Sequence, residues 1–177
     1  MSQAPDLAAR VRDAALLEGD FVLSSGKRSS FYVDKYLFST DPTLLRDIAS
    51  ALAETLPPGL DRLAGVELGA VPLVVATALQ TGLPYVIVRK AAKEYGGSAG
   101  RAVEGVVGRG ERVVLLEDVV STGTQAVKAA RELDALGVEV VKVVAVLDRR
   151  EEPGGELGEF PFQSLLKMDE LRVGKRD

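Results

Sequence analysis

Two adjacent carboxylates, Glu117 and Asp118, follow an apolar run and precede a short segment of hydroxyl and glycine residues. This segment reads Ser121-Thr122-Gly123-Thr124, and apolar residues at helical spacing come after it. Free backbone N–H groups in such a turn, together with the N-terminus of the following helix, bind phosphate. Carboxylates accept hydrogen bonds from vicinal hydroxyls. The order of these residues therefore predicts a site that holds a sugar phosphate.

A plainer interpretation is that an acid in this stretch caps the next helix, because apolar runs ending in aspartate are common at the edge of parallel sheets. The doubled acid and the crowded hydroxyls favour the phosphate site over a cap alone. A Walker-type loop is excluded, since no lysine follows Gly123 and the glycine spacing of that loop is absent.

Composition restricts the chemistry that is available. The chain has 177 residues, 46% of them hydrophobic and 27% charged, which predicts one globular domain with a substantial core. It contains no cysteine and no histidine. A thiolate nucleophile, a zinc–thiolate site and the commonest general base are thereby excluded. Reactions must use carboxylates, lysines, arginines, hydroxyls and backbone amides.

Charge and hydropathy bear on partners and location. The net charge of −4 argues against a nucleic-acid partner. No apolar run approaches the roughly 20 residues that span a bilayer, and the N-terminal segment lacks the pattern of a signal peptide. We therefore expect a cytoplasmic protein without membrane contact. A local cluster of cations at Arg89, Lys90 and Lys93 suits a small anionic ligand.

The elements that position these residues alternate between helix and strand across a core of about residues 41–149. Helices are expected at 42–56, after an Asp41 cap, at 72–79, ended by Gly82, and up to 136, stopped by Gly137. Strands are expected at 63–67, 83–88, 112–117 and 140–148. This alternation predicts an α/β fold whose parallel central sheet is flanked by helices on both faces.

The segments outside this core differ in character. Residues 1–40 predict an amphipathic helix and then a strand pair around residue 26, and residues 150–177 combine a turn at 153–155 with a last apolar patch. We expect both segments to form a hood over one end of the sheet, within a single domain of residues 1–177. The glycine-rich stretch 90–110 predicts a mobile catalytic loop, with a solvated β-hairpin as the alternative.

Four stretches together make the chain resemble the type I phosphoribosyltransferases, and among them the orotate phosphoribosyltransferases. Residues 113–124 resemble the signature that binds phosphoribosyl diphosphate (PRPP), and residues 21–34 resemble the family's substrate hood. Residues 88–96 are similar to its catalytic loop, and Leu147-Asp148-Arg149 is similar to the strand end that presents an arginine to orotate. The resemblance implies a pentosyltransferase of pyrimidine (UMP) biosynthesis that converts orotate and PRPP into orotidine 5′-phosphate and pyrophosphate.

The resemblance also implies roles for individual residues. Those implied to be catalytic are Lys90, Lys93 and Asp118. Those implied to bind PRPP are Arg89, Lys90, Lys93, Glu117, Asp118, Val119, Val120, Ser121, Thr122, Gly123, Thr124 and Gln125. Those implied to bind orotate are Lys27, Tyr32, Ser121 and Arg149, while Leu68 and Gly69 form the pyrophosphate turn. The family further implies Mg²⁺ held mainly by PRPP, without direct side-chain ligands, and a homodimer in which the loop lysines reach the partner's site.

Three positions depart from patterns found in some members of this family. Ser24 stands where some have a lysine, for which Lys27 is a candidate replacement, and Tyr95 takes the place of a loop histidine. The turn at residues 68–72 lacks a Tyr-Lys pair, so we expect it to act through backbone amides.

Alternatives remain open for two residues and for the whole chain. Arg149 could instead form a surface salt bridge with Asp148 or Glu151, and aromatic Tyr32 could serve only in packing. The chain could be a transferase for another base, or a catalytically silent regulator that senses PRPP.

Overall fold

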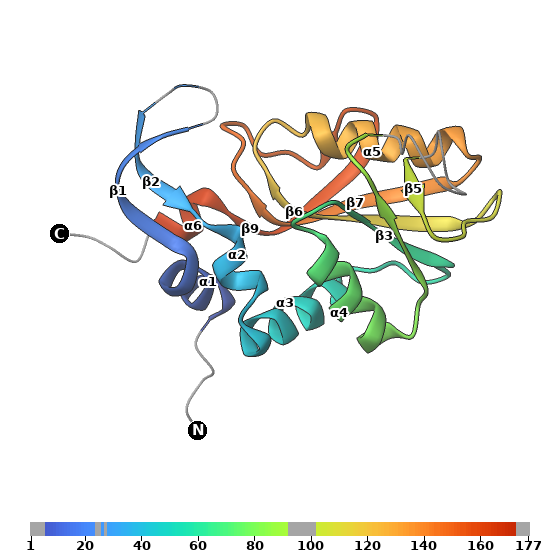
Figure 1. The fold of residues 1–177 in the computed structure, drawn as a ribbon, viewed down its shortest axis with the longest axis horizontal. Coiled ribbons are helices and arrows are strands. Elements are labelled where there is room, and N and C mark those ends of the chain that lie inside the picture. Colours follow the sequence, from blue (N-terminus) through green and yellow to red (C-terminus); the bar gives the residue numbers. More distant parts are fainter. Residues whose placement is uncertain (1–5, 24–25, 27, 92–101, 173–177) are drawn as a thin grey trace.

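A seven-stranded sheet forms the centre of the computed structural model, which describes residues 6–23, 26, 28–91 and 102–172 (Figure 1). The strands lie in the order β5-β4-β3-β6-β7-β9-β8. The five inner strands run parallel to one another, and the short edge strands β5 and β8 are antiparallel to their neighbours. Their bounds are β3 Arg62–Val66, β4 Tyr85–Val88, β5 Val103–Glu104, β6 Arg112–Val120, β7 Glu139–Asp148, β8 Glu156–Leu157 and β9 Phe160–Lys167.

Helices cover both faces of this sheet, because alternate residues of its apolar strands point to opposite sides. Val114 and Leu116 of β6 belong to the core shared with α3 (Pro42–Glu54) and α4 (Val71–Thr81). Val113 and Leu115 belong to the core shared with α5 (Thr124–Ala135), which lies along the opposite face (Figure 1). The predicted α/β class with a covered, mainly parallel sheet is confirmed.

The helix ends follow the capping signals in the sequence. Asp41 precedes α3, and its carboxylate accepts a 2.7 Å hydrogen bond from the N–H of Leu44, with Pro42 in the first position. Helix α4 ends at Gly82, whose φ of +73° suits a residue without a side chain. Across the described part of the chain, no helix is long and apolar enough to cross a membrane.

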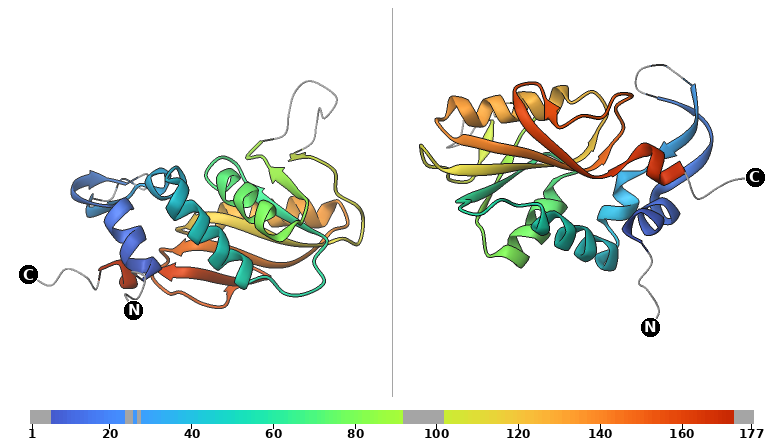
Figure 2. Two further views of the ribbon diagram at one scale, coloured as in Figure 1. Left: turned by 90° about the horizontal axis from the view of Figure 1, so that it is seen from below. Right: turned by 180° about the vertical axis from the view of Figure 1, so that it is seen from behind.

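The N-terminal segment forms a small unit beside the sheet. It consists of α1 (Leu7–Ala15), an antiparallel hairpin of β1 (Leu16–Val22) and β2 (Arg28–Val33), and α2 (Lys35–Ser39). Figures 1 and 2 show this hairpin standing apart from the main sheet, with α6 (Met168–Arg172) next to α1. The helix and strand pair expected in residues 1–40 are confirmed, whereas α2 was not predicted.

The C-terminal segment differs from the prediction that all of residues 150–177 belong to the hood. Strand β9 pairs in parallel with β7 and lies inside the main sheet. Phe160, Phe162 and Leu166 are buried there, while Pro161 and Gln163 between them are exposed. Because only one side of this strand is buried, its buried residues alternate with exposed ones and form no continuous apolar run. The sequence analysis missed the strand for this reason.

The glycine-rich stretch contains strand β5, which pairs with β4 just before the stretch begins. Ile87 and Val88 of β4 pair antiparallel with Glu104 and Val103 of β5, so the stem of this stretch is a hairpin. Residues 92–101 lie outside the described residues, and with them the predicted Lys93 and Tyr95. The mobile catalytic loop therefore stays a prediction.

Candidate active site

The acids Glu117 and Asp118 lie on β6 near the carboxyl edge of the sheet. We predicted that the strand ends at 117, but pairing with β7 continues to Val120, so both acids belong to the strand. Glu117 and Asp118 are only 7% and 3% exposed. Because pairing with β7 holds this part of β6, the two acids are fixed more rigidly than they would be in a loop after the strand.

Burial strongly affects the protonation of Glu117. Burial, and then the neighbouring charge of Asp118, raise the pKa of Glu117 to about 8. Its Oε1 accepts a 3.1 Å hydrogen bond from the N–H of Asp118, while Asp118 Oδ1 accepts one of 2.6 Å from the N–H of Val119. A protonated Glu117 at neutral pH can both donate and accept hydrogen bonds.

A lysine from α2 completes this acidic pair, and the sequence analysis missed it. Lys35 Nζ lies 2.6 Å from Asp118 Oδ2, and the lysine side chain is 35% exposed. Partial burial lowers the pKa of Lys35, but the hydrogen bond and charge of Asp118 outweigh it and raise that pKa. Asp34 caps α2 by accepting a 3.0 Å hydrogen bond from the N–H of Tyr36. No motif surrounds Lys35, and only the fold brings it to Asp118.

The predicted pyrophosphate turn packs directly against this ion pair. A Cβ atom placed on Gly69 would lie 1.5 Å from Asp118 Oδ2 and 3.1 Å from Lys35 Nζ. Only glycine fits in this position. The neighbouring Leu68 is 64% exposed and follows a cis peptide bond with Glu67. The structure therefore brings together Leu68, Gly69 and the acids, which are far apart in sequence.

The predicted phosphate loop connects β6 to α5. Ser121, Thr122, Thr124 and Gln125 are exposed, and the hydroxyls of Thr122 and Thr124 lie 3.0 Å apart. Gly123 occupies the N-cap position of α5 with a φ of +83° and gives the helix no side-chain cap. The first N–H groups of a helix without such a cap are available to an anion. This geometry agrees with the phosphate site rather than with a capping acid.

The first residues of the glycine-rich stretch are anchored through their backbone. The N–H of Lys90 donates a 2.7 Å hydrogen bond to Glu67 Oε1, and its carbonyl accepts one of 3.1 Å from Lys128 Nζ on α5. Arg89 Nη1 lies 3.7 Å from Glu104 Oε1. Glu67 and Lys128 were not predicted, since neither belongs to a motif. They fix the point where the lysine-bearing segment leaves the sheet.

The residues predicted for orotate lie in two places. The N–H of Arg149 donates a 2.8 Å hydrogen bond to the carbonyl of Val120, which puts this arginine next to the predicted phosphate loop. Tyr32 is 41% exposed on β2, and its ring centre lies 5.6 Å from that of Phe21. Lys27 and Ser24 lie outside the described residues.

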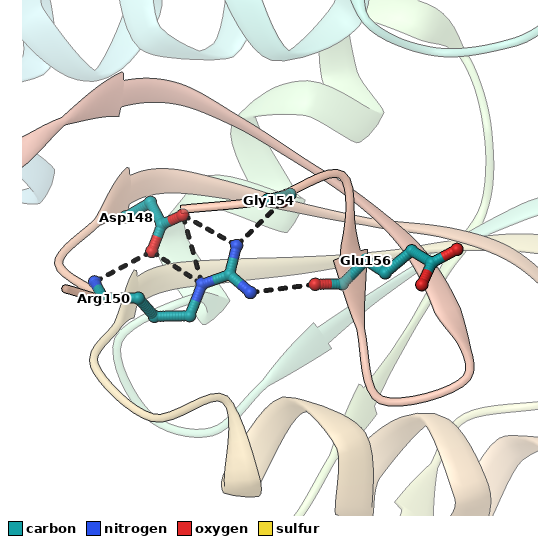
Figure 3. A network of polar contacts seen from close by, with 4 residues as sticks. All are labelled: Asp148, Arg150, Gly154 and Glu156. Atoms are coloured by element: carbon teal, nitrogen blue, oxygen red, sulfur yellow. Dashed lines mark hydrogen bonds and ion pairs between the residues drawn. The ribbon is translucent and has the colours of Figure 1, made fainter. Parts of the chain in front are cut away.

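The alternative pairing of Arg149 with Asp148 is wrong, because Arg150 takes that carboxylate (Figure 3). Arg150 Nη2 lies 2.8 Å from Asp148 Oδ2 and 2.9 Å from the carbonyl of Gly154, and Nη1 lies 2.8 Å from the carbonyl of Glu156. Its guanidinium also lies 4.6 Å from the centre of the Phe162 ring. This network fixes the backbone beside Arg149 and leaves the Arg149 side chain without an ion pair to another described residue.

Comparison with known proteins places these features in one family. A family model for the phosphoribosyl transferase domain matches residues 42–157. The orotate phosphoribosyltransferase of Natronomonas pharaonis is 47% identical over 169 residues, which cover 94% of this chain and 95% of that protein. That of Archaeoglobus fulgidus is 48% identical over 158 residues, with coverage of 89% and 84%. The chain belongs to the orotate phosphoribosyltransferase family.

Solved structures of orotate phosphoribosyltransferases share the fold. The enzyme from Aeropyrum pernix has a TM-score of 0.81 at 31% identity, and the match covers 96% of this chain and 98% of that one. The enzyme from Mycobacterium tuberculosis, solved in complex with PRPP, has a TM-score of 0.75 at 27% identity, covering 94% and 96%. The segment before residue 42 lies outside the family model, whereas the two structural matches cover at least 94% of this chain and therefore include most of that segment.

Proposed function

We propose that this chain transfers the phosphoribosyl group of PRPP to N1 of orotate, forming orotidine 5′-phosphate and pyrophosphate in pyrimidine biosynthesis. The observation that carries this function is the meeting, at one sheet edge, of the β6 acids, the Gly69 turn and the uncapped N-terminus of α5. Membership of the orotate phosphoribosyltransferase family, with relatives matched over nearly their whole length, agrees with this arrangement.

The reaction needs electrostatic stabilisation rather than a covalent nucleophile. Positive charge grows on the ribose as the bond from C1 to pyrophosphate lengthens, and negative charge grows on the leaving group. In the proposed complex, Glu117 and Asp118 bind the ribose hydroxyls, and residues 121–125 with the N-terminus of α5 bind the 5-phosphate. The turn at Leu68 and Gly69 binds the diphosphate. A chain without cysteine or histidine is suited to this chemistry.

Orotate offers a carboxylate and two ring carbonyls. Arg149 can bind such groups through two parallel N–H donors, and Ser121 lies in the adjacent phosphate loop. The Arg150 network holds the strand end that carries Arg149. We assign Tyr32 and Lys27 to the same base pocket by family resemblance.

Mg²⁺ is proposed to enter with PRPP. Within the described residues, no group of three or more acidic, histidine or cysteine side chains is arranged to hold a metal ion. Asp118 already pairs with Lys35. By family resemblance we propose an ion held mainly by substrate oxygens, which would neutralise charge on the departing pyrophosphate.

We further propose a cytoplasmic homodimer in which Lys90 and Lys93 of one chain act on PRPP bound by the other. The family resemblance and the position of Lys90 at the exposed edge of the site support this arrangement. Analytical ultracentrifugation of the purified chain tests whether the dimer exists.

The reaction is tested by incubating the purified chain with orotate, PRPP and Mg²⁺ and following orotate absorbance and pyrophosphate release together. We expect both signals to change in equal amounts, and the reverse reaction to run from orotidine 5′-phosphate. Uracil and hypoxanthine serve as competing bases. Equal turnover of either would overturn the orotate assignment, and binding of PRPP without turnover of any base would favour the silent regulator.

A further inference from the structure

Lys35 lies between two parts of the site that we assign to different groups of PRPP. On one side its Nζ lies 2.6 Å from Asp118 Oδ2, the acid assigned to the ribose. On the other side it would lie 3.1 Å from a Cβ atom on Gly69, in the turn assigned to the diphosphate. The 1-diphosphate of PRPP is attached to the ribose beside its 2-hydroxyl. The diphosphate and this hydroxyl must therefore both lie close to Lys35 in the proposed complex.

The turn itself brings no side-chain cation. Residues 68–72 read Leu-Gly-Ala-Val-Pro. A diphosphate bound there would face the buried carboxylate of Asp118 at close range, and like charges at short distance repel strongly in a poorly solvated site. A positive charge between the turn and the acid would relieve this repulsion, and the Lys35 ammonium lies there.

Lys35 is also able to change partners. Its ammonium has three donors on a flexible stem, whereas the structure gives it one carboxylate partner, Asp118. A side chain that is 35% exposed can contact a ligand without unfolding its surroundings. A purely structural ion pair would not need this access.

We propose that Lys35 is a substrate-binding residue that contacts the diphosphate of PRPP and supplies, from α2, the cation that the Gly69 turn lacks. This inference rests on the proposed function. When PRPP is absent, the same ammonium neutralises Asp118. When PRPP binds, the ribose hydroxyls share Asp118, and the remaining ammonium donors hold the diphosphate oxygens.

Pyrophosphate and ribose 5-phosphate separate this role from a merely structural one. Titration calorimetry with Mg²⁺ present would measure both ligands on the full chain and on Lys35→Gln. We expect pyrophosphate affinity to fall roughly 10- to 100-fold, the range for losing one charge-assisted hydrogen bond. Ribose 5-phosphate affinity should change less than about threefold, and Lys35→Arg should recover most of the pyrophosphate binding.

Lys142→Gln is the matched control. Lys142 lies towards the start of β7, at the far end of the strand from Asp148, and is likewise held by hydrogen bonds, to Thr55 and Gln163. Like Lys35→Gln, the Lys142→Gln substitution removes one positive charge, but pyrophosphate affinity should stay unchanged. Lys35→Gln combined with Asp118→Asn removes both members of the ion pair and so does not leave the Asp118 carboxylate buried without its cation. The double variant therefore tests the inference even if the single variant folds poorly.

The outcomes separate this inference from the reaction. Unchanged pyrophosphate affinity in Lys35→Gln, or an effect of Lys35→Gln that disappears in the Asp118→Asn background, would show that the lysine only balances Asp118. Pyrophosphate binding that depends on Lys35 in a chain that does not turn over orotate would overturn the reaction but support the lysine's role. A wild-type chain that does not bind pyrophosphate would overturn both.

Discussion

Asp118 and Asp148 lie near the carboxyl ends of neighbouring strands, and each is paired with a cation. Both acids are almost completely buried, at 3% and 2% exposure. Asp148 is held by Arg150, two residues along the chain, through several contacts to its carboxylate. Asp118 is held by Lys35, which comes from a separate element far earlier in the sequence.

The two cations, Arg150 and Lys35, differ in how many of their hydrogen-bond donors have partners. Arg150 is 15% exposed, and it binds two backbone carbonyls and lies over the Phe162 ring as well as binding the acid. Lys35 is more exposed and has donors to spare. A closed local network of this kind stabilises a turn, whereas an open pair between distant elements can rearrange around a ligand. Similar acids in similar positions therefore serve different purposes.

Breaking the closed network should give the largest effect, on stability. Arg150→Met leaves Asp148 buried without its cation, which costs about 3–5 kcal/mol. For a domain of this size we expect Tm to fall by roughly 6–20 °C, measured by circular dichroism. The double variant with Asp148→Asn should recover part of the loss. Arg131→Met, which breaks the exposed pair with Glu159, should change Tm by about 2 °C or less. An equal fall in both single variants would contradict the comparison.

Disturbing the open pair should act mainly on activity. Gly69→Ala places a methyl group where Asp118 Oδ2 lies, so the turn, the acid or Lys35 must move. We expect kcat/KM for PRPP to fall about 100-fold or more, equivalent to roughly 2.7 kcal/mol of transition-state stabilisation.

Gly155→Ala is the control in the turn that the Asp148–Arg150 network stabilises. No atom lies within 4 Å of the Cβ atom that this substitution adds. Its kinetics should match those of the wild type. If Gly69→Ala kept full activity with the same KM for PRPP, the turn would not touch the substrate.

The smallest effect, for each unit of pH, should be a pH dependence of stability at the open site. Burial and the charge of Asp118 raise the pKa of Glu117 from 4.5 to about 8. Between these values the folded protein binds the proton that the unfolded chain has released, so this group makes stability fall as pH rises.

Glu117→Gln removes this dependence. Its stability relative to the wild type should increase from about pH 5 to pH 8, by at most about 1.4 kcal/mol per pH unit, and level off above that. Urea unfolding at several pH values measures the difference. A difference that stays constant across this range would mean that Glu117 is ionised in the folded protein.

Local signals in the sequence were enough to identify most of the elements and to predict part of the candidate site. Asp41 with Pro42 and Gly82 marked helix ends because capping and left-handed backbone depend on the residue itself. The sequence could predict a phosphate loop because the glycine and hydroxyl residues of such a loop stand next to each other in the chain. The β9 strand was not predicted, because its alternating pattern resembles a polar surface segment until a neighbouring strand is known.

The sequence by itself determined which residues carry charge, which turns need glycine, and which family the chain resembles. Tertiary structure alone decided which cation meets which acid. Arg149 and Arg150 are adjacent and chemically identical, yet only Arg150 reaches Asp148, since successive residues leave the strand end in different directions. Lys35 meets Asp118 because α2, which contacts α1 and α3, carries it to the acid on β6. A contact between residues so distant in sequence depends on the whole fold rather than on any local pattern.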